Sequence, residues 1–149
     1  MKIEDEIKGR FRNDYHKAVI NLIYTSNYIN NLFVSFLKKH GLTSQQYNVL
    51  RILRGFGSEP QSIDFLKERM LDKSSDMSRI VERLFQKALV KREENLNDRR
   101  RKDIRITSEG LNLLGQLDEC EKKVDNLLSN LSQEETIQFN KLLDKIRGQ

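Results

Sequence analysis

The amino-acid sequence predicts a mainly α-helical fold that carries one small β-hairpin, which we call the wing. Three observations predict this fold class. An amphipathic helical segment that starts at Ser74 is followed directly by two short strand-like runs. Helical spacing of apolar residues dominates the chain on both sides of this stretch. The 149 residues contain one proline and no tryptophan, so proline interrupts few of the predicted helices.

The N-terminal segment Ile3–His40 is predicted to form one long helix, with a break near Arg10–Asp14. It contains no proline, and its only glycine is Gly9. A helix of this length cannot be buried by its own small domain, so we expect its N-terminal part to pack against a partner chain. The apolar positions with helical spacing are Ile3, Ile7, Phe11, Tyr15, Ala18, Val19, Leu22, Ile23, Ile29, Phe33, Phe36 and Leu37.

Two shorter helices are predicted in the next part of the chain. Thr43 and Gln46 match a capping box at the start of the first, which Gly55–Pro60 ends. A short strand is expected at Gln61–Ser62. The serine of this strand then caps the second short helix, Ile63–Met70.

The stretch 74–107 contains the predicted recognition helix and the wing. The helix has an apolar stripe and should end near Lys87–Leu89. Two strands follow, Val90–Asn95 and Lys102–Thr107, and a polar tip at 96–101 joins them. A helix followed at once by a basic hairpin is typical of a winged helix-turn-helix, whose recognition helix enters the DNA major groove.

The positive charge of the chain is concentrated around this stretch. Residues 67–105 contain thirteen Lys/Arg and eight Asp/Glu, and this excess of +5 equals the net charge of the whole chain. A local basic excess on an otherwise balanced protein is the electrostatic footprint of a protein that binds the phosphate backbone. The pattern therefore favours nucleic-acid binding over a solvated surface with scattered charge.

Two further helices are predicted after the wing. Thr107 caps the first, which runs to about Asn130, and Ser132 with Glu135 forms a capping box for the second. Together with the first helix they carry more apolar surface than an isolated winged helix needs. A coiled coil is the alternative interpretation, but the heptad pattern is not sustained.

Other classes of protein are poorly supported. No apolar run approaches 18 residues and the N-terminus has no apolar signal region, so we expect a cytoplasmic protein without a membrane segment. The single cysteine, Cys120, excludes an intramolecular disulfide. His16 and His40 stand apart, without carboxylates or cysteines at metal-ligand spacing. Phosphate-binding and nucleophile motifs are absent, so we expect no enzyme, no metal and no cofactor.

Four short motifs resemble one family, the MarR-type winged helix-turn-helix transcriptional regulators. They are Ser78–Leu84 in the recognition helix, Leu89–Arg92 in the wing, Asp98–Arg100 at its tip, and Ile106–Gly110 after it. The likeness covers nearly the full chain. Two residues depart from the family pattern: Ala88 and Lys67 replace a common glycine and a small residue, respectively.

The resemblance implies a two-fold dimer and a regulatory function. Residues 1–40 and 108–149 would form a helical dimerisation region, and residues 41–107 a DNA-binding lobe. The partners would be a palindromic operator in double-stranded DNA, a second copy of the chain, and a small aromatic or anionic ligand. The chain would then be a sequence-specific regulator, usually a repressor, modulated by that ligand. The alternative is a winged-helix module that binds protein and has only nonspecific affinity for DNA.

The predicted DNA contacts lie on the recognition helix and at the wing tip. Arg79 is suited to a guanine edge or a phosphate, and Arg83 to the backbone, although Arg79 could instead pair with Asp76 or Glu82. By resemblance, Arg100 enters the minor groove, and Asp98 braces the tip or is a plain turn residue. The full set of predicted DNA-binding residues is Ser74, Ser75, Ser78, Arg79, Arg83, Arg99, Arg100 and Arg101.

A ligand pocket is expected where the first and fifth helices meet the DNA-binding lobe. Its candidate lining residues are Phe33, Phe36, His40 and Tyr47. The same side chains could equally belong to the core, and the sequence does not identify a ligand.

Overall fold

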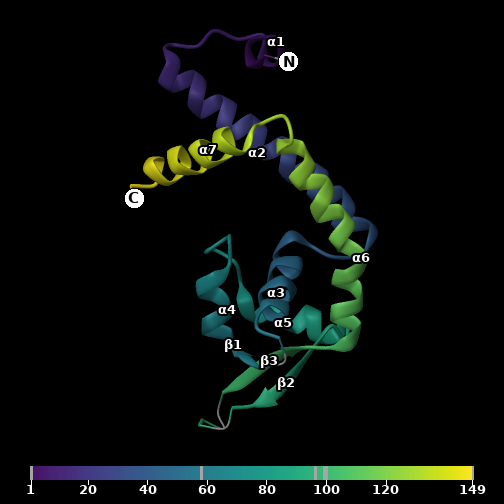
Figure 1. The fold of residues 1–149 in the computed structure, drawn as a ribbon. Helices are drawn as coiled ribbons and strands as arrows, with labels where there is room; N and C mark the ends of the chain where they lie inside the picture. The colour runs from purple at the N-terminus through teal and green to yellow at the C-terminus, as the bar shows by residue number, and fades with distance from the viewer. Residues whose placement is uncertain (1, 58, 96, 99–100, 149) are drawn as a thin grey trace. The chain divides into compact units, whose positions relative to one another are not determined.

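The computed structural model describes residues 2–57, 59–95, 97–98 and 101–148, without the side chains of Cys120 and Glu121. The chain is mainly helical with one small sheet, as the sequence predicts (Figure 1). It forms two compact units. One comprises residues 34–123 and is called the winged-helix unit; the other comprises residues 1–33 and 124–149 and is called the terminal-helix unit.

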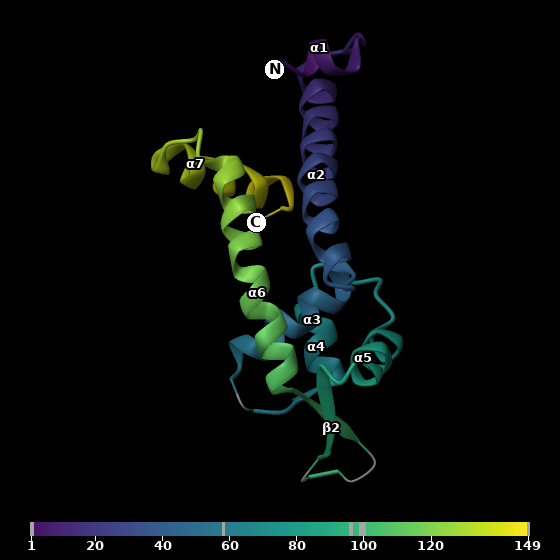
Figure 2. The ribbon, with the colours of Figure 1, turned by 90° about the vertical axis from the view of Figure 1, so that its right-hand side faces the viewer.

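The winged-helix unit contains a three-stranded antiparallel sheet and the helices that pack on it. Its elements are the end of α2 (Asp14–Lys39), α3 (Ser44–Gly55), β1 (Gln61–Ser62), α4 (Ile63–Arg69), α5 (Met77–Gln86), β2 (Val90–Glu94), β3 (Lys102–Ile106) and most of α6 (Ser108–Asp125). The strand order is β1-β3-β2, with Ile104 opposite both Gln61 and Arg92. Helices α3, α4 and α5 lie together, and the β2–β3 hairpin extends away from them (Figure 2).

One apolar core joins the elements of this unit. Leu50 on α3, Leu66 on α4 and Leu84 on α5 are each fully buried. Ile104 from β3 is equally inaccessible, and Leu114 and Leu117 bring α6 into the same unit. Because these two leucines are buried, the compact unit extends beyond the predicted lobe of residues 41–107. The family departure at Lys67 has no effect on this core, since that side chain is exposed on α4.

Local capping explains where several helices begin. Thr43 and Gln46 form the predicted capping box at α3, in which each side chain bonds to the other residue's backbone N–H. The hydroxyl of Ser62 accepts a hydrogen bond from the Phe65 N–H at the start of α4. These helix starts were predicted from sequence, and the structure confirms them.

The recognition helix α5 begins later than predicted. It starts at Met77 rather than Ser74, and the carboxylate of Asp76 is its N-cap, accepting from the Arg79 N–H at 3.1 Å. Ser74 instead belongs to the preceding turn, where its N–H and hydroxyl both donate to Asp72. This local side-chain hydrogen bonding competes with the helix and delays its start.

The C-terminal end of α5 is a Schellman motif with an alanine in the left-handed position. Ala88 has φ +58°, its N–H donates to Phe85 O at 2.9 Å, and the Leu89 N–H donates to Leu84 O at 3.0 Å. Leu84 and Leu89 are both buried, which supplies the apolar contact typical of this motif. An alanine in this conformation costs about 1 kcal/mol relative to glycine. The departure from the family pattern at Ala88 therefore leaves the left-handed helix end in place at a small cost in strain.

The end of α5 is fastened to the start of α6. The Thr107 hydroxyl donates to Ala88 O at 2.8 Å, and the Thr107 N–H donates to Leu89 O at 3.1 Å. The same hydroxyl accepts from the Gly110 N–H, so Thr107 caps α6 as predicted. A Cβ on Gly110 would lie 2.4 Å from Leu89 O, so only glycine allows this approach.

The terminal-helix unit contains α1 (Ile3–Ile7), the first part of α2, the 3₁₀ turn η1 (Asn126–Leu128) and α7 (Gln133–Ile146). The long N-terminal helix is broken as expected, since Lys8 adopts a left-handed φ of +52° and α2 starts at Asp14. An ion pair between Glu4 and Lys17 holds α1 against α2. Helix α6 ends at Asp125, earlier than the predicted Asn130, because the chain tightens into η1.

This second unit buries few apolar side chains. Ile3 is its only buried hydrophobic residue among those described, and α7 has none, although its predicted capping box at Ser132 and Glu135 is present. Tyr15 is 86% exposed and Ile146 is 71% exposed. Over the described residues, no helix is long and apolar enough to cross a membrane.

Candidate nucleic-acid interface

Helix α5 has one buried apolar face and one exposed polar face. Met77, Val81 and Leu84 point into the core and fix the rotation of the helix. Ser78, Arg79 and Arg83 are exposed as a result. Arg79 follows Ser78 directly, and Arg83 lies four positions after Arg79 on the same side of the helix. The first two turns therefore present a hydroxyl and two guanidinium groups to solvent.

The two arginines of α5 are available for an external partner. The carboxylate of Asp76 is used by the Arg79 backbone, and the carboxylate of Glu82 binds Arg92. Among the described residues, neither Arg79 nor Arg83 takes part in an ion pair. The alternative in which Arg79 pairs with Asp76 or Glu82 is therefore not what the structure shows.

Ser74 and Ser75 lie before α5 rather than on it. Ser74 is exposed but its hydroxyl donates to Asp72 Oδ1 at 2.6 Å, while Ser75 is half-buried. The hydrogen bond from Ser74 holds the pKa of Asp72 below its usual value. Both serines therefore belong to a structured turn, not to the first turn of the recognition helix.

The base of the wing is organised by Asn95. Its side-chain N–H donates to the Asp103 carboxylate at 2.8 Å, and its side-chain oxygen Oδ1 accepts from the Asn97 and Asp98 backbone N–H groups at 2.9 Å. The Asp98 carbonyl accepts a hydrogen bond from the Arg101 N–H at 2.9 Å. Arg99 and Arg100 lie outside the described residues, so the contacts predicted for them, and for Asp98 with them, stay predictions.

One face of the wing carries an ionic cross-strand ladder. Arg105 binds the Glu93 carboxylate with two nitrogens, at 2.8 and 3.0 Å, and Lys91 approaches it at 3.1 Å. The hydrogen bonds from Arg105, with those from Lys91, lower the pKa of Glu93. Bidentate pairing across adjacent strands stiffens the hairpin that must carry the tip.

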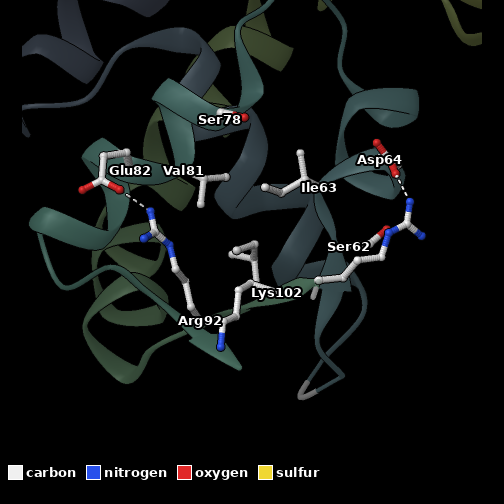
Figure 3. Close-up of a pocket in the computed structure, with 10 residues that line it drawn as sticks. Ser62, Ile63, Asp64, Ser78, Val81, Glu82, Arg92 and Lys102 are labelled. Atoms are coloured by element: carbon white, nitrogen blue, oxygen red, sulfur yellow. Dashed lines mark hydrogen bonds and ion pairs between the residues drawn. The ribbon is translucent and has the colours of Figure 1, made fainter. Parts of the chain in front are cut away.

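A pocket of about 470 Å³ lies between the wing, α4 and α5 (Figure 3). Ile63, Val81 and Ile104 form the apolar part of its lining. Arg92 of β2 pairs with Glu82 of α5, and its guanidinium carbon lies 4.7 Å from the Phe85 ring centroid. On the other side, Arg101 pairs with Asp64 of α4 at 3.0 Å. The full lining is Ser62, Ile63, Asp64, Ser78, Val81, Glu82, Arg92, Arg101, Lys102 and Ile104.

The residues predicted to line a ligand pocket do not line this one. Within the winged-helix unit, Tyr47 is buried in the core, and Phe36 is half-buried with the Lys39 and Lys123 ammonium groups 6.0 and 5.7 Å from its ring centroid. His40 Nδ1 lies 3.1 Å from Phe36 O. Phe33 is half-buried and belongs to the terminal-helix unit. Their assignment to a ligand site stays a prediction.

The structure adds residues that the sequence prediction omitted. Arg92, Lys102 and Asp64 share the pocket with Ser78, although none of them was a predicted site residue. Arg92 belongs to the Leu89–Arg92 motif, and it lies two positions after the buried Val90, on the helix-facing side of the strand, which is a signal that could have included it. Asp64 has no comparable sequence signal, because its partner Arg101 is 37 positions away.

Comparison with known proteins identifies relatives of this chain. A family model described as the MarR family matches residues 42–102, from the turn before α3 to the start of β3. The HTH-type transcriptional regulator MhqR of Bacillus subtilis is 29% identical over 86% of this chain and 86% of its own length. The HTH-type transcriptional regulator MgrA of Staphylococcus aureus is 30% identical over 73% and 72%, respectively.

Two solved structures share the fold. One is the organohalide-sensing regulator RdhR-CbdbA1625 bound to 2,4-dichlorophenol, with a TM-score of 0.78, 19% identity, and coverage of 93% of this chain and 85% of that one. The other is the S. aureus MepR–DNA complex, with a TM-score of 0.76, 22% identity, and coverage of 92% and 97%. The chain belongs to the MarR family, and its relatives are DNA-binding helix-turn-helix transcriptional regulators.

Proposed function

We propose that this protein is a homodimeric, sequence-specific DNA-binding regulator, acting in the cytoplasm as a repressor that a small molecule modulates. The observation that carries the proposal is the polar face of α5. Ser78, Arg79 and Arg83 are exposed on a helix whose rotation is fixed by the core, beside a basic wing. Arginines without an internal partner pay no cost of breaking an ion pair when they bind bases or phosphates.

A footprint on the DNA flanking its own gene tests this function. A regulator with two recognition helices related by a two-fold axis protects two inverted half-sites separated by one helical turn or a multiple of it. Protection of such a palindrome, with affinity that falls as salt rises, would support the proposal. Capture of a protein partner without preference among DNA sequences would favour the alternative, a winged-helix interaction module.

The roles of the two α5 arginines can be separated by substitution. Arg79 lies nearer the start of α5, so Arg79→Ala should weaken operator binding by about 1–3 kcal/mol and random-DNA binding by less. Arg83→Ala should weaken both similarly and flatten the salt slope by about one phosphate contact. Competition between operator and scrambled duplexes at several salt concentrations measures this; an unchanged ratio for Arg79→Ala removes it from the specificity residues.

The wing tip supplies a further test. By family resemblance Arg100 enters the minor groove, so Arg100→Ala should weaken operator binding by about 1–3 kcal/mol while leaving the melting temperature unchanged. Unchanged affinity in a gel-shift series would transfer the role to Arg99 or Arg101.

The proposed dimer would use the terminal-helix unit. Its α7 exposes Ile137, Leu142 and Ile146, and α2 exposes Tyr15 and Val19. A second copy of the chain would bury these side chains, and at about 25 cal/mol per Å² this burial is a large driving force. Sedimentation that shows a stable monomer at micromolar concentration would contradict it.

The proposed ligand is a small aromatic or anionic molecule. The fold is shared with a regulator solved with 2,4-dichlorophenol, and Phe36 and His40 are the candidate contacts on this chain. Titration with substituted phenols should release operator DNA, and Phe36→Ala should raise the concentration required. Release that is unaffected by Phe36→Ala and by His40→Ala would remove these two residues from the proposed ligand contacts.

A further inference from the structure

Two arginines of the wing are held by carboxylates from the two helices of the helix-turn-helix. Arg92 of β2 binds Glu82 of α5, and Arg101 binds Asp64 of α4 at 3.0 Å. The two pairs stand on opposite sides of the apolar floor of the pocket (Figure 3). They differ in this respect from Arg79 and Arg83, which have no ion-pair partner among the residues described.

These ion pairs are exchangeable. All four side chains keep at least 36% of their surface in solvent, and an exposed pair of this kind contributes little net free energy. A guanidinium group binds carboxylate and phosphate with the same two-pronged geometry. A DNA phosphate can therefore replace either carboxylate without a change in the arginine's hydrogen-bonding pattern.

The Glu82–Arg92 pair has more supporting contacts than the Asp64–Arg101 pair has among the described residues. Gln86 donates to the second oxygen of Glu82 at 3.1 Å, and the Phe85 ring supports the Arg92 guanidinium. Arg92 thus keeps its position beside α5 when its carboxylate partner is neutralised. The Asp64–Arg101 pair has no such support among the described residues and is more exposed, so its effect should be the smaller.

We propose that Glu82 and Asp64 restrain DNA binding by occupying Arg92 and Arg101, so that each carboxylate must be displaced by a phosphate when the wing engages DNA. This inference rests on the proposed function. Its consequence concerns specificity: random DNA offers mainly phosphate contacts, and these must compete with the two carboxylates. The acidic residues act as positioning residues, because they work through the arginines.

Glu82→Gln and Asp64→Asn test the proposal in the full-length protein. Binding to a random-sequence duplex, followed by fluorescence anisotropy at several salt concentrations, should become about two- to fivefold tighter for each variant. The slope of log K against log salt should steepen by about one phosphate contact. Glu82→Gln should have the larger effect.

Asp144→Asn is the matched control. It removes the same charge from an exposed carboxylate, which binds Arg147 on the C-terminal side of α7 in the other unit. If net charge alone were responsible, this variant would tighten binding as much as Glu82→Gln does, and that outcome would overturn the proposal.

Double variants show whether the acid acts through the arginine. Glu82→Gln added to Arg92→Ala should leave affinity for random DNA at the level of Arg92→Ala alone. A full gain in the absence of Arg92 would mean that Glu82 simply repels DNA, and it would overturn the inference. Wild-type protein that binds no duplex at low salt contradicts the proposed function instead, whereas wild-type binding with an unchanged Glu82→Gln contradicts only this inference.

Discussion

The two compact units of this chain differ in how far they bury their apolar residues. In the winged-helix unit Leu50, Leu66 and Leu84 are completely buried, and the sheet contributes Ile104 to the same core. In the terminal-helix unit the apolar residues of α7 are not buried, and the side chain of Ile146 is 71% exposed. Ile3 is the single buried hydrophobic residue described in this unit. Both units are built from amphipathic helices, so the difference lies in what their apolar faces contact.

The winged-helix unit buries its own apolar faces, whereas the terminal-helix unit leaves apolar side chains of α2 and α7 exposed. Extended exposed apolar surface is uncommon on monomers and usually marks an interface. The winged-helix unit should therefore keep its structure when the terminal helices lose theirs. Substitutions in the terminal-helix unit should affect dimerisation, whereas substitutions in the winged-helix unit should affect its own stability.

The largest effect is expected from charging the exposed apolar positions of α7. Leu142→Asp with Ile146→Asp places two carboxylates where apolar burial is proposed, which costs several kcal/mol and should abolish dimerisation. Sedimentation should show monomeric protein in which the winged-helix unit stays folded. Lys141→Asp, at an exposed polar position of the same helix, changes the net charge by the same amount and should leave the dimer intact. Equal loss of dimer in both variants would contradict the proposal that the exposed apolar residues of α7 form the dimer contact.

A smaller loss is expected at the contact between α5 and α6. Gly110→Ala places a Cβ 2.4 Å from Leu89 O and 2.7 Å from the Ile106 side chain, and should cost roughly 1–3 kcal/mol in unfolding free energy. Gly115 lies in the same helix, and a Cβ added there would meet nothing within 4 Å, so Gly115→Ala should be neutral or stabilise by up to about 1 kcal/mol. Chemical denaturation compares the two, and equal effects would contradict the tight approach.

A gain is expected at the end of α5. Ala88→Gly relieves the left-handed strain at φ +58° and should stabilise the winged-helix unit by about 0.5–1 kcal/mol. Lys8→Gly makes the same change at φ +52° after the five-residue α1, where little structure depends on the turn. Thermal melting should therefore rise for the first variant and stay nearly constant for the second.

The smallest effect concerns acid pH. The pKa of Glu93 lies below its ordinary value of 4.5 because Arg105 and Lys91 bind the ionised carboxylate. The stability that this gives is present above pH 4.5 and is lost as the pH falls through the lower pKa of the folded state. Glu93→Gln should reduce the dependence of the melting temperature on pH in that range. An unchanged pH profile would mean that the ladder contributes no measurable stability.

The elements that follow from local chemistry were predictable from the sequence. The capping boxes at Thr43 and Ser132 require only two residues three positions apart, and both are present. The start of α5 was not predictable in this way. Ser74, Ser75 and Asp76 are all good N-cap residues, and the choice of Asp76 depends on Asp72 holding Ser74 in the preceding turn.

The interface was predictable only in part. Ser78, Arg79 and Arg83 lie on an amphipathic helix, so the spacing of Met77, Val81 and Leu84 was sufficient to place them on its exposed face. Whether an arginine is paired is a different question. The partners of Arg92 and Arg101 are separated from them by 10 and 37 positions, and only the packing of the wing against α4 and α5 brings them together.

The fastening of α5 to α6 through Thr107 and Gly110 also has a mechanical consequence. Two hydrogen bonds and a close backbone contact join the end of one helix to the start of the other, so a rotation of one relative to the other would have to break them. The end of α5 and the start of α6 therefore form one connected junction around Leu89. We therefore expect a rotation of the first turn of α6 to carry the polar face of α5 with it.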